Sequence, residues 1–267
     1  MIKERVHMKR LYIIAIVLVV VATVALIGTF LLLRTESPFT KVSKMQIGNE
    51  EIGVLLLGDS TVVLKTSSHT LIVDPATRIS SNDVKALGKV DAILITHEHG
   101  DHFNAGTTSQ LQQASGAVVV ANKGAYQGLE GLIQESGKMV ELEPEGKTGV
   151  DGIVIEAVLS NHGGTLPLMY IITADGITIF HGSDSGFNPS LEQYAGKIDI
   201  AFVPTGGPSP TASPQEAYSI TATLRPKKLI PIHGTSDQNS EFRNLVSDIS
   251  GVSFVEADLT EPIKVSV

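Results

Sequence analysis

The feature that most constrains this chain is a group of metal-binding side chains placed directly after an apolar strand. Residues 91–96 read Asp-Ala-Ile-Leu-Ile-Thr and are apolar on both faces, as in a strand buried within a sheet. The next six residues contain three histidines and an aspartate: His97, His99, Asp101 and His102. Imidazole and carboxylate ligands suit zinc, iron or manganese. The sequence therefore predicts a metal site at the end of a buried strand.

The spacing of these residues separates them into two sets. In an extended segment positions i and i+2 point the same way, so His97 and His99 can share one metal. Gly100 permits a sharp turn, which can aim Asp101 and His102 at a second metal. A solvated histidine-rich loop is the competing interpretation.

Three more candidates follow other predicted strands. His162, Asp184 and His233 each come shortly after a run rich in valine, isoleucine or leucine. A lone histidine is more often a surface or core residue, and an aspartate can simply cap a turn. Together with the first group, however, the three candidates argue against chance.

The predicted elements after residue 45 are those of an α/β protein. Short β-like runs dominate residues 52–73, and helices and strands then alternate. The expected helices cover residues 105–114, 123–136, 214–224 and 239–249. This order favours two stacked sheets with helices outside, a four-layer αββα sandwich.

The order and spacing of the seven candidate residues resemble the ligand signature of the metallo-β-lactamase superfamily. The resemblance covers residues 46–267, and within the superfamily it is greatest to the ascorbate-6-phosphate lactonase group. Four segments carry that closer resemblance, at residues 72–75, 180–186, 204–207 and 231–234.

The resemblance implies a dinuclear site. One metal would be bound by His97, His99 and His162, and the second by Asp101, His102 and His233, with Asp184 bridging both. Nitrogen and oxygen ligands suit zinc best, while manganese and iron stay open.

The resemblance also implies a hydrolase. Two divalent ions can share a water and lower its pKa toward about 7, which would supply a bridging hydroxide for an ester-like bond, such as a lactone, carboxylester or phosphodiester. Asp101 would orient this nucleophile. His181 would donate a proton to the leaving group, or would instead orient a ligand.

One turn departs from the pattern of the relatives. Many of them carry a histidine in the turn after the first strand, where this chain has Asp59. If that histidine contacts substrate, the change affects which substrate this chain accepts.

The N-terminal region predicts a membrane anchor. Leu11 to Leu33 contains no charged residue and is long enough to span a bilayer. We expect a basic cytoplasmic tail at 1–10, a single transmembrane helix at 11–33, a linker at 34–45 and the hydrolase domain at 46–267. Basic residues crowd the tail, which favours an extracytoplasmic domain at the cell membrane. A cleaved signal peptide is the alternative.

The net charge limits the classes of molecule that this protein can be expected to bind. The charge of −8 argues against a nucleic acid held through its phosphates. We expect a small-molecule or lipid-derived substrate. The alternative function is a catalytically inactive binding or scaffold protein with the same fold.

Overall fold

The computed structural model describes residues 16–23, 36–206 and 211–267. They fall into two units, Met1–Ser37 and Pro38–Val267. In the first unit residues 16–23 are helical. Most of the expected membrane span, Leu11–Leu33, lies outside the described residues, so its prediction stays a prediction. Within the described residues, no helix combines the length and apolarity that crossing a bilayer requires.

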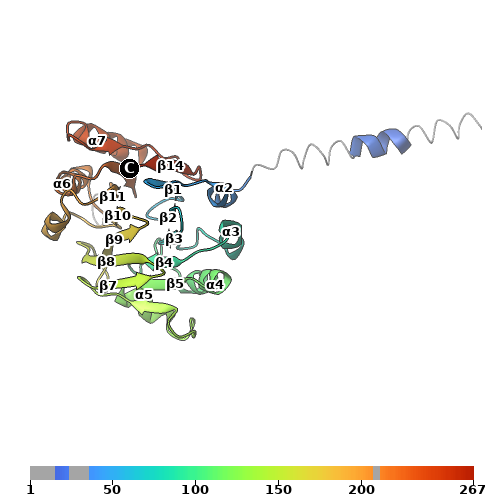
Figure 1. Ribbon diagram of the computed structural model, residues 1–267, viewed down its shortest axis with the longest axis horizontal. Helices are drawn as coiled ribbons and strands as arrows, with labels where there is room; N and C mark the ends of the chain where they lie inside the picture. Colours follow the sequence, from blue (N-terminus) through green and yellow to red (C-terminus); the bar gives the residue numbers. More distant parts are fainter. Residues whose placement is uncertain (1–15, 24–35, 207–210) are drawn as a thin grey trace, which may run out of the picture. The chain divides into compact units, whose positions relative to one another are not determined.

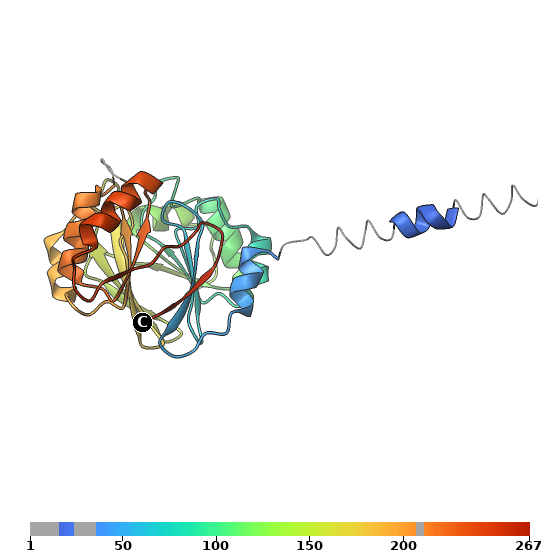
Figure 2. The same ribbon diagram turned by 90° about the horizontal axis from the view of Figure 1, so that it is seen from above.

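The second unit contains two mixed sheets of seven strands each (Figures 1 and 2). In spatial order, the first sheet is β14 (Ile263–Ser266), β1 (Glu51–Leu56), β2 (Val62–Lys65), β3 (Thr70–Val73), β4 (Ala92–Ile95), β5 (Val118–Ala121) and β6 (Met139–Glu141). The second sheet is β13 (Ser253–Phe254), β12 (Lys228–Ile232), β11 (Ile200–Pro204), β10 (Ile177–His181), β9 (Leu168–Ala174), β8 (Ile153–Leu159) and β7 (Lys147–Val150).

Helices cover the outer face of each sheet (Figure 2). Against the first sheet lie α2 (Pro38–Lys44), α3 (Ser81–Leu87), α4 (Ala105–Ser115) and α5 (Lys123–Leu129). Against the second lie the 3-10 helix η1 (Pro189–Tyr194) and the helices α6 (Pro214–Leu224) and α7 (Ser236–Val246). The four-layer αββα architecture expected from the sequence is confirmed.

The alternation of side chains along the strands builds three apolar layers. In β4, Ala92 and Leu94 belong to the core between the sheets, whereas Ile93 and Ile95 pack under the helices of the first sheet. Successive residues of a strand point to opposite faces, so a strand that is apolar at every position can supply both layers. This explains why residues 91–96 carry no polar face.

The strand directions bring several carboxyl ends to one edge of the sandwich. Strands β3, β4 and β5 run parallel to one another, as do β10, β11 and β12. β8 is antiparallel to β9, which is antiparallel to β10, so β8 and β10 also point the same way. The loops that follow these strands therefore meet, although they are far apart in the sequence.

Two local expectations differ from the structure. Residues 38–44, expected within a linker, form α2, because Phe39 and Val42 are apolar and bury themselves under the first sheet. The helix expected to reach residue 136 ends at Leu129, and Gly131 beyond it has a positive φ of 79° that continues the turn.

Candidate metal centre

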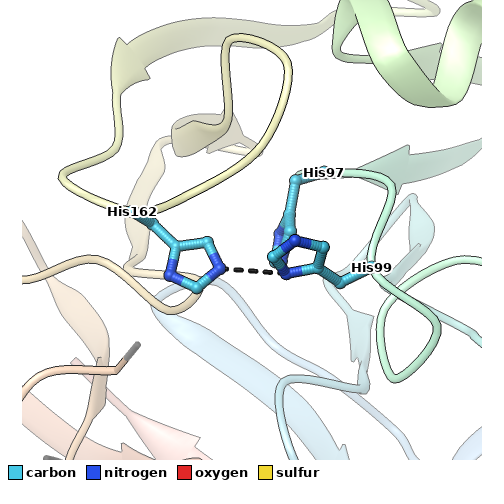
Figure 3. A group of neighbouring side chains, drawn as sticks. All are labelled: His97, His99 and His162. Atoms are coloured by element: carbon cyan, nitrogen blue, oxygen red, sulfur yellow. Dashed lines mark hydrogen bonds between the residues drawn. The ribbon is translucent and has the colours of Figure 1, made fainter. Parts of the chain in front are cut away.

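The first cluster of candidate ligands contains three histidines from two loops. His97 and His99 follow β4, and His162 lies in the loop between β8 and β9 (Figure 3). His97 Nε2 lies 3.0 Å from His99 Nδ1, and His162 Nε2 lies 3.1 Å from the same atom. Nitrogens of a tetrahedral zinc site are about 3.3 Å apart, given zinc–nitrogen distances of about 2.0–2.1 Å. The three rings are thus already gathered as ligands of one ion would be.

The second cluster combines two carboxylates and two histidines from three loops. Its members are Asp101, His102, Asp184 and His233, and their ligand atoms lie within 4.8 Å of one another. His233 Nε2 lies 3.5 Å from Asp101 Oδ2 and 3.5 Å from Asp184 Oδ1. The loops follow β4, β10 and β12 at the shared edge.

Asp184 stands between the two clusters. Its Oδ1 lies 3.0 Å from His102 Nε2 in the second cluster, and its Oδ2 lies 3.9 Å from His162 Nε2 in the first. Each carboxylate oxygen therefore faces a different cluster, which is the arrangement that a bridging ligand requires.

A hydroxyl orients the ring of His97. Thr96 Oγ1 donates its only proton to Asp74 Oδ2 at 2.8 Å and accepts one from Ser183 Oγ at 2.8 Å. It can then only accept from His97 Nδ1, which lies 3.0 Å away. The proton of a neutral His97 ring is thereby placed on Nδ1, and the Nε2 lone pair faces the cluster.

A buried carboxylate does the same for His102. Asp74 follows β3, is fully buried, and accepts from His102 Nδ1 at 2.8 Å. Its other oxygen accepts from the backbone N–H of Thr96 at 2.8 Å. Carboxylates that hold the outer nitrogen of a ligating histidine fix its orientation and raise its basicity. Asp74 lies in the segment 72–75 that resembles the family, but its role is not evident from the sequence, where the available signal is a lone aspartate after a buried strand.

Opposite charges set the protonation of the site. Burial favours neutral His102, yet Asp74 and Asp184 outweigh burial and raise the pKa of His102 to about 10. Burial also opposes ionisation of Asp184, but the neighbouring imidazoles, first that of His102, hold its pKa well below the usual range. For His97, burial and the nearby His102 lower the pKa to about 3, so this ring is neutral at pH 7.

The residues present fit a metal. His102 Nε2 is buried and makes no hydrogen bond of acceptable geometry within the described part of the chain, although it faces two carboxylates. Without a metal this nitrogen is protonated and ion-paired with Asp184 at 3.0 Å, and a divalent ion would take the place of that proton. A set of imidazoles and carboxylates with converging lone pairs is suited to divalent ions, and the second nitrogens of His97 and His102 are already held.

His181 is buried, and both of its ring nitrogens are engaged. It is fully buried, its Nδ1 accepts from the backbone N–H of Ser183 at 3.3 Å, and its Nε2 donates to the carbonyl of Ser60 at 3.0 Å. Burial lowers its pKa, which keeps the ring neutral. The expectation that His181 acts as an acid stays a prediction: its Nε2 ties β10 to the turn after β1, and its Nδ1 bonds within the loop that follows β10. The alternative expectation, a residue that orients the site, agrees with these contacts.

Asp59, which replaces the histidine of many relatives, contacts the backbone of His233. The Asp59 carbonyl accepts from the backbone N–H of His233 at 3.0 Å, and its carboxylate pairs with Arg78. His233 has a positive φ of 51°, which costs a non-glycine residue about 1–2 kcal/mol. Contacts around its backbone must hold it there.

Gly206 is one of these contacts. A Cβ atom at this position would lie 1.7 Å from the carbonyl oxygen of His233, so the loop after β11 can approach only as glycine. This explains why residue 206, within the segment 204–207, is a glycine.

The fold and the paired clusters together define a metal-dependent hydrolase of the metallo-β-lactamase type. The sequence profile of the "Beta-lactamase superfamily domain" matches residues 54–233. A UPF0173 metal-dependent hydrolase of Pyrococcus horikoshii is 32% identical over 219 residues, which cover 74% of this chain and 93% of that protein. The chain belongs to the UPF0173 metal-dependent hydrolase family of the metallo-β-lactamase superfamily.

Solved structures share the fold. Igni18, a metallo hydrolase from Ignicoccus hospitalis, has a TM-score of 0.69 at 20% identity and covers 81% of this chain and 99% of its own. The metallo-β-lactamase fold protein YhfI from Bacillus subtilis has a TM-score of 0.61 at 16% identity, with 80% of this chain and 99% of its own covered. At these identities the likeness concerns the fold alone, and the closer resemblance to the lactonases stays a prediction.

A Gly206→Ala substitution should weaken the second cluster selectively. The added methyl group displaces the His233 backbone, so we expect about one equivalent of bound metal in place of two. Elemental mass spectrometry of the full chain measures this. Gly149→Ala, in β7 at the edge of the second sheet, is the matched control, since the nearest atom to a Cβ there lies 3.8 Å away. Equal metal content in both variants would contradict the role assigned to Gly206.

Metal binding should strengthen with pH. Below a pKa of about 10, His102 is protonated in the metal-free chain, and an ion must displace that proton to reach Nε2. The apparent zinc affinity should rise by up to about tenfold per pH unit for this one proton between pH 6 and 8. Calorimetric titrations in buffers of different ionisation enthalpy measure the release. Asp74→Asn removes the first charge that raises this pKa, so its pH dependence should be shallower; an equally steep dependence would contradict this account.

Proposed function

We propose that this protein is a dinuclear hydrolase that cleaves an ester-like bond, namely a lactone, carboxylester or phosphodiester. The observation that carries the proposal is Asp184, whose two oxygens face different clusters. In this proposal His97, His99 and His162 hold one ion, Asp101, His102 and His233 hold the other, and Asp184 joins them. Zinc suits this donor set best, with manganese and iron as alternatives.

Bound divalent ions would supply an activated water at neutral pH and polarise the oxygen of the scissile bond. The protein's own residues would hold the ions and orient the water and the substrate. Asp101 is the more exposed carboxylate of the site, with 45% of its side chain accessible, so it can accept a hydrogen bond from the attacking water. Asp184 is nearly buried and ionised, and it keeps the two clusters in register.

A cavity of about 670 Å³ beside the second cluster offers room for a substrate. His233 lies in its wall, together with Asp59 and Arg78 on one side and the start of α7 on the other. A volume of this size suits a small molecule. The cavity has both polar and apolar walls, the latter including Leu56 and Leu259, which is compatible with a lipid-derived or lactone-like substrate.

Asp184→Asn tests the proposed reaction. The amide keeps the shape but replaces one charged ligand oxygen with a donor, so we expect kcat/KM to fall by at least about 100-fold. Lactone, carboxylester and phosphodiester substrates are assayed with the zinc- and manganese-loaded full chain. Asp248→Asn, at an exposed residue after α7, is the control. Absence of turnover on all three substrate types by the metal-loaded wild type would contradict the proposed bond class.

We also propose that an N-terminal helix anchors the protein in the cell membrane, with the hydrolase domain outside the cytoplasm. The uncharged segment from Leu11 to Leu33 and the basic residues before it support this. The anchor would keep the active site near lipid-derived substrates.

Fractionation tests the anchor. The full chain should stay with membranes through an alkaline carbonate wash, since about 20 apolar residues insert stably, and a variant lacking residues 1–35 should be released. Protease added to intact cells should degrade the hydrolase domain if it lies outside. Release of the full chain by the wash would contradict the anchor, and protection in intact cells would contradict the orientation.

A further inference from the structure

Glu98 lies between two candidate ligands, yet its side chain points away from both clusters. Its Oε1 accepts from the backbone N–H of Thr165 at 2.7 Å, and its Oε2 accepts from the side-chain amide of Asn122 at 3.0 Å. The same amide donates to the carbonyl of Thr165 at 2.8 Å. Three segments distant in the sequence meet here, namely the loop after β4, the start of α5 and the loop between β8 and β9.

This third segment carries His162, which reaches the first cluster from the opposite side to His97 and His99 (Figure 3). Before His162, the loop is attached through Asn161, whose backbone N–H donates to Ser185 Oγ at 2.8 Å. After His162 come Gly163 and Gly164, which restrict the backbone little. The contacts of Thr165 with Glu98 and Asn122 then fix the part of the loop that follows His162.

The surroundings are shaped for this carboxylate. Asn122 is fully buried, and its Oδ1 caps α5 by accepting from Ala125 N at 3.1 Å, so all its polar atoms are engaged. At Gly124 a Cβ atom would lie 2.3 Å from Glu98 Oε2, so a larger residue would expel the carboxylate. A buried donor that loses its acceptor costs about 1–3 kcal/mol, which makes the arrangement hard to leave.

We propose that Glu98 is a positioning residue that clamps the His162 loop, through Asn122 and Thr165, and so completes the first metal cluster. The inference rests on the proposed metal-binding role of His97, His99 and His162. Glu98 itself contacts neither metal nor substrate. It makes the first cluster depend on the start of α5.

Zinc titration of the full chain tests the clamp. Glu98→Gln has the same shape but turns one acceptor into a donor, which then faces either Thr165 N–H or the Asn122 amide. We expect the zinc affinity of the first cluster to fall about 10- to 100-fold, the usual effect of losing an outer partner of a metal ligand. Adding the substitution to His233→Ala, which disables the second cluster, reports on the first cluster directly. Glu130→Gln, at an exposed residue, is the control.

Exchanging the side-chain types of Glu98 and Asn122 distinguishes a positioning role from a general loss of stability. Asn122→Asp keeps the oxygen that caps α5 but sets two carboxylates against each other, so it should also lose zinc affinity. In Glu98→Gln with Asn122→Asp, the amide at residue 98 can donate to the carboxylate at residue 122, but the Thr165 carbonyl loses its donor, so we expect only part of the lost affinity to return. A cooperative thermal melting transition in each metal-free variant shows that it folds.

The outcomes distinguish the inference from the proposed function. If the wild type binds no zinc at the first cluster, the proposed function fails. If the wild type binds zinc and Glu98→Gln binds it equally well, the clamp is refuted while the function stands.

Discussion

The site depends on one buried carboxylate. Asp74 sits at the end of β3 with no exposed surface, and it is bound by the backbone and hydroxyl of Thr96 and by the ring of His102. A buried charge is tolerated only where donors surround it. These donors belong to the loop that carries four of the candidate ligands, so the bonds that satisfy Asp74 also orient the rings of His97 and His102.

The double-sheet sandwich makes this loop possible. Because β4 is apolar on both faces, it lies in the middle of its sheet, between β3 and β5, with layers of core above and below. Its carboxyl end therefore emerges at a well-supported point, next to the ends of β3, β8, β10 and β12. Ligands bind outside the carboxyl ends of such strands because the loops there converge while the core stays intact.

Close backbone approaches complete the arrangement. His233 is held in a left-handed conformation by the carbonyl of Asp59 and by the proximity of Gly206. Glycine is required at position 206 because two segments of the backbone approach each other more closely than a Cβ atom would allow. Gly206, in one of the segments that carry the family resemblance, thus has a steric explanation in the molecule itself.

Local patterns in the sequence were enough to predict the class of fold and the set of candidate ligands. A strand apolar at every position needs two cores, and histidines and aspartates at fixed spacing after strands need little context to be recognised. The sequence could not determine the role of His181, because a histidine three residues before Asp184 is compatible with a donor or a structural residue until its neighbours are known. Nor could it reveal Asp74, Asn122 or the helix at residues 38–44. These depend on contacts between segments far apart in the sequence, and only the packing of one sheet on the other brings those segments together.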